Sequence, residues 1–185
     1  MISLRPPADV EGLLREQQAV PLSYAEVGAT RGELPAGYRV DRRTDAIGRG
    51  DDAFEQASRA LLTWQMHEGA GVRVTPHETA REGLTVALVV RAMGLYTISA
   101  CRVVYVIDEP DRRGFAYGTL RDHPVQGEER FVVSRAPDGE VTSELLAFSR
   151  PSSLLFKLGA PVTRRTQFAI GAAYVEALRR SVSRS

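Results

Sequence analysis

The sequence predicts an α+β domain in which a curved antiparallel β-sheet wraps around a long C-terminal α-helix. Two observations support this prediction. Six β-rich runs follow one another between residues 72 and 150, with no helical pattern between them, which is typical of an antiparallel meander. Residues 164–184 then repeat apolar side chains at helical spacing. A sheet curled around one terminal helix is the helix-grip architecture, and it leaves space for a small-molecule site.

The chain has 185 residues, a length that suits one domain spanning residues 1–185. Residues 6–18 predict a short helix after a proline start, because Val10, Leu13 and Leu14 lie on one side. A Gly- and Pro-rich loop that carries Tyr24 follows it. We expect residues 1–50 to pack on the helix-grip domain as this helix and loop segment.

Residues 51–69, "DDAFEQASRALLTWQMHEG", predict one amphipathic helix. Asp52 can cap it and Glu55 can complete a capping box, while Gly69 is placed to end it. Four apolar residues recur at helical spacing and predict a buried stripe, namely Phe54, Ala57, Leu61 and Trp64.

The predicted strands cover residues 72–77, 84–93, 96–110, 114–120, 128–135 and 140–150. The C-terminal helix follows, with an apolar side formed by Phe168, Ala172, Val175, Leu178 and Val182. Gly171 interrupts it at a cost of roughly 1 kcal/mol relative to alanine. Close approach by a ligand would explain this glycine, but tight packing of the helix on the sheet is the favoured interpretation.

Residues 114–133 predict a hairpin, and its register decides which side chains face the interior. We expect Gly118 to pair with Glu129 and Ala116 with Phe131 on the concave surface. Tyr117 then faces solvent beside Arg130.

An inward Glu129 needs a partner or a raised pKa, because a buried carboxylate is costly. It is either a member of an ion pair, with Arg102 or Arg150 as its partner, or a functional acid or base. His123 lies in the turn before Pro124, where an exposed structural role competes with that of a proton donor near Glu128 or Glu129.

Composition argues against several classes of function. The net charge is +1, so no strong field attracts nucleic acid. The only cysteine, Cys101, lies in a predicted buried strand, and the three histidines match no metal-ligand spacing, so we expect neither a metal nor another cofactor. "AIGRGDDAF" is not a dinucleotide fingerprint, because the charged "RVDRRTDA" before it is not a buried strand. No signal peptide or membrane span is apparent, which predicts a cytoplasmic protein.

Six stretches of the chain form a recognisable set, namely "LSYAEVGATRGELPAGY", "LLTWQMHEGAGV", "CRVVYVIDEPDRRGFAYGTL", "HPVQGEERFVV", "AFSRP" and the helix from Gln167 to Leu178. Together they resemble the DUF1990 (UPF0548) family of bacterial and plant proteins, which has no known activity. The order of elements also resembles, more loosely, the START/Bet v 1-like (SRPBCC) helix-grip group. That likeness implies binding of lipids, polyketides or other apolar molecules, and in some members cyclase or dehydratase activity.

We therefore expect a protein that binds an apolar or amphipathic small molecule between the sheet and the C-terminal helix. The candidate ligand-binding residues are Tyr24, Arg102, Tyr117, Glu129, Phe131 and Arg150. The first alternative is an enzyme of cyclase or dehydratase type on the same scaffold, with Glu129 or His123 as acid or base. The second is a protein-interaction module with a filled cavity. The sequence does not indicate an oligomeric state.

Overall fold

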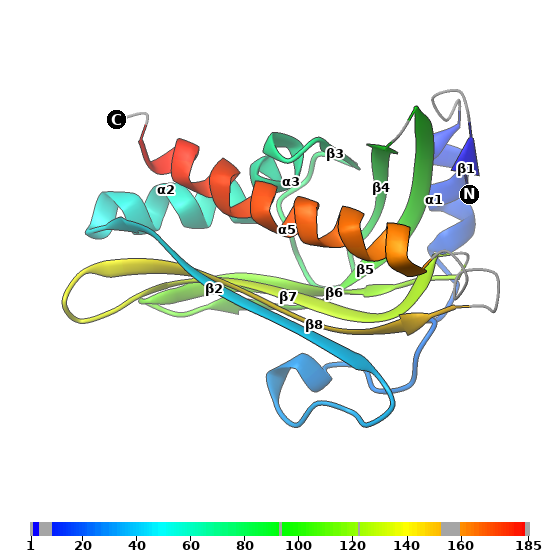
Figure 1. The fold of residues 1–185 in the computed structure, drawn as a ribbon, viewed down its shortest axis with the longest axis horizontal. Coiled ribbons are helices and arrows are strands. Elements are labelled where there is room, and N and C mark those ends of the chain that lie inside the picture. Colours follow the sequence, from blue (N-terminus) through cyan, green and yellow to red (C-terminus); the bar gives the residue numbers. More distant parts are fainter. Residues whose placement is uncertain (1, 4–8, 93, 122, 153–159, 184–185) are drawn as a thin grey trace.

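The computed structural model describes residues 2–3, 9–92, 94–121, 123–152 and 160–183, of which 160–168 are described as helix backbone only. Seven strands form one curved antiparallel sheet (Figure 1). Their order across the sheet is β2 (Arg39–Arg49), β8 (Glu140–Pro151), β7 (Val125–Arg135), β6 (Arg112–Thr119), β5 (Leu95–Asp108), β4 (Thr85–Ala92) and β3 (Val72–Thr75). A short strand, β1 (Ile2–Ser3), pairs with β5. The predicted meander of six strands, β3 to β8, is confirmed.

The sequence interpretation missed β2. Its residues are mostly exposed and alternate arginine with aspartate, so the strand has no apolar pattern by which it could be found. It pairs with β8 at the edge of the sheet. Charged side chains are a common protection of such an edge against pairing with another chain.

Three helices pack on one side of the sheet, which we call the concave face (Figure 1). They are α2 (Asp51–Leu62), α3 (Gln65–Gly69) and α5 (Ala160–Val182). On the opposite, convex face, α1 (Val10–Gln17) contacts β4 through Leu14, and the loop containing η1 (Ala29–Arg31) covers β7 and β8. A sheet that closes on a long C-terminal helix confirms the predicted fold class.

The predicted helix over residues 51–69 is two helices. The chain turns at Trp64, whose φ of 65° is a left-handed conformation that large side chains rarely adopt. Gly50 precedes the first helix without a side-chain cap, so the capping box predicted at Asp52 is wrong. The turn places both Trp64 and His67 in the core, where each is 0% exposed. The predicted stripe of four apolar residues is buried throughout.

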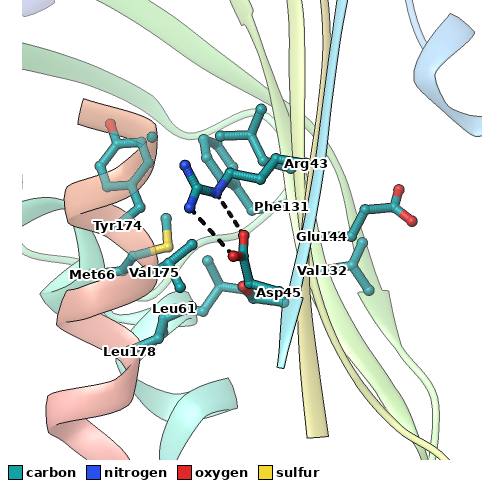
Figure 2. A pocket seen from close by; sticks show the side chains of 13 residues that line it. Arg43, Asp45, Leu61, Met66, Phe131, Val132, Glu144, Tyr174, Val175 and Leu178 are labelled. Atoms are coloured by element: carbon teal, nitrogen blue, oxygen red, sulfur yellow. Dashed lines mark hydrogen bonds and ion pairs between the residues drawn. The ribbon is translucent and has the colours of Figure 1, made fainter. Parts of the chain in front are cut away.

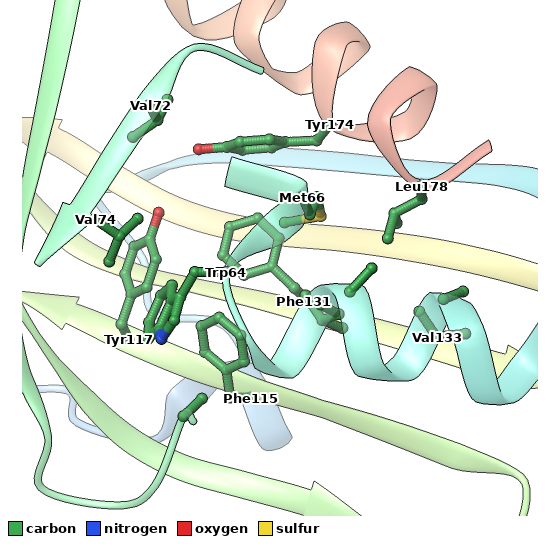
Figure 3. Packing of buried hydrophobic residues seen from close by; sticks show 14 of the residues in the cluster. Trp64, Met66, Val72, Val74, Phe115, Tyr117, Phe131, Val133, Tyr174 and Leu178 are labelled. Atoms are coloured by element: carbon green, nitrogen blue, oxygen red, sulfur yellow. The ribbon is translucent and has the colours of Figure 1, made fainter. Parts of the chain in front are cut away.

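The core fills the space between the sheet and the described turns of these helices. Its largest buried side chains include Trp64, Phe54, Phe115 and Leu178 (Figure 3). The C-terminal half of α5 contributes Tyr174, Val175 and Leu178, of which the last two belong to the predicted apolar side. The side chain of Phe168, also expected there, lies outside the described part of the chain.

The hairpin register differs from the predicted one by one residue. Glu129 pairs with Tyr117 and Phe131 with Phe115, so Glu129 and Phe131 do face the concave side, but Tyr117 joins them there instead of facing solvent. The physical reason lies at Gly118 on the convex face. A Cβ atom at that position would collide with the ring and hydroxyl of Tyr24, so the glycine makes room for the loop.

Candidate functional site

Strand register arranges the concave side chains in rows that run across β2, β8, β7 and β6. One row consists of Asp41, Ala147, Glu129 and Tyr117. The next consists of Arg43, Leu145, Phe131 and Phe115. Charged residues of the edge strand therefore meet a central acid and a set of aromatic rings on a single surface.

Glu129 is the polar centre of this surface. Its half-buried carboxylate accepts a hydrogen bond of 2.9 Å from the hydroxyl of Tyr117. Burial raises the pKa of Glu129 from 4.5 to about 7, the charge of Asp41 adds to the rise, and the bond from Tyr117 opposes it. Near neutral pH this group is present in both protonation states, so it can donate or accept a proton.

Aromatic rings surround the carboxyl group. Tyr174, from α5, lies 5.6 Å from Phe131 and 4.8 Å from His67, measured between ring centroids. Figure 3 shows the hydroxyl groups of Tyr174 and Tyr117 on the same side of this cluster. Burial and the nearby Glu129 raise the pKa of both tyrosines well above 10, so their hydroxyl groups remain protonated.

His67 lies inside the same cluster and was not predicted to belong to a site. It packs against the rings of Trp64, Phe115 and Phe131, and burial lowers its pKa to about 3. Neither ring nitrogen has a hydrogen-bond partner among the described residues. A neutral histidine whose two nitrogens are both unpaired among the described residues is unusual in a core.

An open recess lies between α5 and the strands beside this cluster; we call it the Gly171 groove (Figure 2). The recess is shallow: the centre of a water molecule can occupy about 20 Å³ of it, and the 300 Å³ between its walls includes space open to solvent. On the helix side it is lined by Gly171, Tyr174, Val175 and Leu178. On the sheet side it is lined by Arg43, Asp45, Phe131 and Leu145. The side chain of Glu144, by contrast, points away from it (Figure 2).

The groove overturns the favoured interpretation of Gly171. A Cβ atom at this position would meet no atom of the described residues within 4 Å, so tight packing of the helix on the described sheet does not explain the glycine. The residue instead leaves space open on the groove side of α5.

Glu128 faces the convex side, where it holds the loop. Its carboxylate accepts hydrogen bonds from the hydroxyl of Tyr24 (2.7 Å), from the backbone N–H groups of Gly28 (2.7 Å) and Thr30 (3.1 Å), and from the hydroxyl of Thr30. Arg130 supports the same loop by donating to the carbonyl of Thr30 at 2.6 Å. Tyr24 therefore lies across the sheet from Glu129, not beside it.

Arg102 does not pair with Glu129. Its guanidinium donates to the backbone carbonyls of Gln17, Gln18 and Val20 at 2.7, 2.8 and 2.9 Å. These carbonyls lie at and just after the end of α1, so Arg102 satisfies acceptors that a helix terminus leaves free. Its role is to fasten α1 to the sheet.

Arg150 and His123 also lie apart from Glu129. Arg150 is exposed, lies 4.5 Å from the ring centroid of Tyr38 and donates to Gln126. The Nδ1 atom of His123 lies within hydrogen-bond distance of the backbone N and O atoms of Val125, in its own turn. Burial lowers the pKa of His123 to about 4, so it is neutral at pH 7. Of the predicted site residues, the structure brings together Tyr117, Glu129 and Phe131.

The described residues also bear on metal binding and on membrane insertion. No group of three or more His, Cys, Asp or Glu side chains among them could hold a metal ion. None of their helices is long and apolar enough to cross a membrane. Cys101 is a buried free thiol, and burial raises its pKa.

The curved antiparallel sheet and the long C-terminal helix define a helix-grip fold. The chain belongs to the family described as "Domain of unknown function (DUF1990)", which its residues 23–177 match. It is 38% identical over 189 residues to a UPF0548 protein of Deinococcus radiodurans, an alignment that covers 94% of this chain and 91% of that protein. The family resemblance seen in the sequence is confirmed.

Solved structures with little sequence identity share the fold. The Zhui aromatase/cyclase from Streptomyces sp. R1128 is 17% identical and superposes with a TM-score of 0.55, over 80% of this chain and 97% of that chain. A START superfamily protein from Mycobacterium smegmatis is 13% identical, with a TM-score of 0.52 over 79% of this chain and 97% of that chain. At this level of identity the likeness shows the fold alone.

Proposed function

We propose that this protein binds an amphipathic small molecule on the concave face, in the Gly171 groove between α5 and strands β2, β8 and β7. The observation that supports this most directly is the half-buried carboxyl group of Glu129, which has a raised pKa and lies on the concave face one row from Phe131 and Leu145 of the groove wall. Perturbed titratable groups beside an apolar recess are typical of binding sites.

The two parts of such a site have different roles. The apolar wall formed by Phe131, Val175 and Leu178 supplies affinity, at roughly 25 cal/mol per Å² of apolar surface removed from water. The hydroxyl of Tyr117 and the carboxyl of Glu129 orient a polar group of the ligand, because each can donate or accept a hydrogen bond.

The packed core narrows where a ligand can lie. Trp64, Phe115 and Phe131 fill the space under α2 and α3, so within the described residues we place the apolar body of the ligand on the groove side of α5. The proposal thereby gives the expected site between sheet and helix a more specific location, the groove beside Gly171.

A second candidate function, catalysis, is favoured by the pKa of Glu129. A carboxyl group that titrates at about pH 7 is suited to general acid–base chemistry at neutral pH. Glu129 would remove a proton from the substrate, and Tyr117 would hold the carboxyl in position, as in a cyclase or dehydratase. His123 is less suited, because it is neutral at pH 7 and bound to its own turn.

The interaction-module alternative has less support. In the described part of the chain, the large hydrophobic residues that are exposed are Val27, Val40 and Leu95. They belong to three separate segments of the described chain, namely the loop, β2 and β5.

The groove can be tested by filling it. Gly171→Leu should place a side chain in the open space beside α5 and abolish ligand binding while the protein stays folded. The matched control, Gly171→Ala, adds a methyl group that meets no described atom within 4 Å. It should retain binding and raise the free energy of unfolding by about 0.5–1 kcal/mol.

The measurement is native mass spectrometry of the purified protein, followed by thermal shift with a panel of fatty and aromatic molecules. Retention of ligand by wild type and Gly171→Ala, with loss in Gly171→Leu, supports the proposal. Equal ligand retention by all three proteins would place binding elsewhere, and no bound ligand and no thermal shift with any panel molecule would reject it.

A further inference from the structure

Arg43 lies on the wall of the Gly171 groove and is held there by its neighbour on the same strand. It donates from Nε to Oδ2 of Asp45 at 2.5 Å and from Nη2 to Oδ1 at 3.3 Å. The side chains of Arg43 and Asp45 are 34% and 20% exposed. Figure 2 shows the guanidinium group between Asp45 and Tyr174. A cation is thus fixed in orientation beside an apolar wall.

The guanidinium group of Arg43 has N–H donors that the bonds to Asp45 do not use. Arginine carries five N–H donors in a planar fork, and the two bonds to Asp45 use one edge of it. The structure gives no bond from Nη1 of Arg43 to any described residue, and the edge formed by Nη1 and Nη2 is the one that suits a second carboxylate.

A second pair on the same strand shows that the pairing alone does not make a site. Arg39 and Asp41 have the same spacing and also pair, but their side chains are 45% and 39% exposed and neither lines the groove. Arg130 is committed elsewhere, because it donates to the carbonyl of Thr30 and pairs with Glu144 on the convex face. Among these arginines, Arg43 alone combines a fixed fork with an apolar wall.

We propose that Arg43 binds the carboxylate of the ligand, which makes the ligand an amphipathic carboxylic acid with its apolar body against Phe131, Val175 and Leu178. This inference rests on the function proposed above and names its ligand class. Asp45 is a positioning residue that holds the guanidinium and also repels the incoming anion. A monoanionic carboxylate fits this arrangement better than a phosphate, because a doubly charged group would be repelled more strongly by Asp45.

The test compares acids with neutral molecules of similar shape. Binding of decanoate, 2-naphthoate, decanol and 2-naphthol is measured by isothermal titration calorimetry below their aggregation limits. Wild type should bind each acid about tenfold or more tightly than its neutral counterpart, which is the range for a hydrogen-bonded charge pair. Arg43→Gln should remove that preference and change the affinity for the neutral probes less than about twofold.

Three further variants separate charge from geometry. Arg43→Lys should lose part of the preference, because lysine keeps the charge but not the fork. Asp45→Asn should strengthen acid binding, because it removes the repulsion. Arg39→Gln, the matched control outside the groove, should behave as wild type. Circular dichroism and melting temperature confirm that each variant is folded.

The outcomes distinguish this inference from the function on which it rests. If neutral probes bind the groove but acids bind no better, or if Arg43→Gln weakens both classes equally, the carboxylate assignment is wrong and small-molecule binding stands. If no probe binds wild type, both are rejected. If Arg39→Gln removes the preference for acids as fully as Arg43→Gln does, the preference comes from general surface charge and the assignment to Arg43 is wrong.

Discussion

Glu128 and Glu129 are neighbours on β7, but their side chains enter opposite faces of the sheet and different surroundings. On the convex face, four donors satisfy the carboxylate of Glu128, which is 3% exposed. On the concave face, the described residues give the carboxylate of Glu129 one side-chain hydrogen bond, from Tyr117. A fully satisfied carboxylate is a structural clamp, whereas one with spare hydrogen-bonding capacity is free to act on a ligand.

The largest effect is expected on the convex face. Glu128→Ala removes the acceptor shared by Tyr24, Gly28 and Thr30 and leaves their donors unpaired. We expect the free energy of unfolding to fall by about 3–5 kcal/mol, as when one partner of a buried charged network is deleted. Urea denaturation measures the loss, and a value below about 1 kcal/mol would show that the clamp is dispensable.

A smaller effect, which depends on pH, is expected on the concave face. The pKa of Glu129 is about 7 in the folded protein and 4.5 ordinarily, so between those pH values the folded state holds a proton that the unfolded chain has released. Stability contributed by Glu129 is therefore present below pH 4.5 and is lost as pH rises towards 7. Allowing for its partial exposure, the loss is on the order of 1–2 kcal/mol.

Glu129→Gln cannot ionise and should abolish that part of the pH dependence. Wild type and variant are compared by urea denaturation at pH 4.5, 6 and 8, and the variant should gain stability relative to wild type as pH rises. Parallel pH profiles for the two proteins would mean that Glu129 titrates normally, and catalysis by this group would lose its support.

The smallest effects distinguish the two tyrosines. Tyr24→Phe removes one of the donors to Glu128, and we expect a loss of about 1–2 kcal/mol. Tyr117→Phe removes the bond that lowers the pKa of Glu129, so the loss should be about 0.5–1 kcal/mol and the titration midpoint of Glu129 should rise. Carboxyl NMR titration follows the midpoint. A downward shift in Tyr117→Phe would reverse the assigned role of this hydrogen bond.

The sequence was sufficient to predict the helices and strands whose apolar residues recur with a clear period. The meander from β3 to β8 and the long α5 follow from alternation and helical spacing, and the resemblance to the family agrees with them. β2 was missed because its pattern is charged throughout. Its alternation of arginine and aspartate from Arg39 to Asp45 was the signal that could have placed Arg43 on one face of a strand.

The site was harder to predict than the fold, because it depends on register and on contacts between distant segments. The predicted hairpin register was wrong by one residue, so Tyr117 was assigned to solvent instead of the concave face, although Glu129 and Phe131 were placed correctly. Gly118 indicates the true register only once Tyr24 is known to pack against it. The surroundings of His67 could not be foreseen, since its helix was expected to continue straight through Trp64.

Trp64 is an intrinsic fluorescence probe of this protein. It is the single tryptophan of the chain, its indole N–H donates to the carbonyl of Glu78 at 2.8 Å, and its ring lies 6.4 Å from that of Tyr117 at an angle of 18°. Its emission therefore comes from one fixed place, a tyrosine away from Glu129. A molecule that displaces the Tyr117 ring would change the wavelength or intensity of the tryptophan fluorescence, so binding could be followed without an added label.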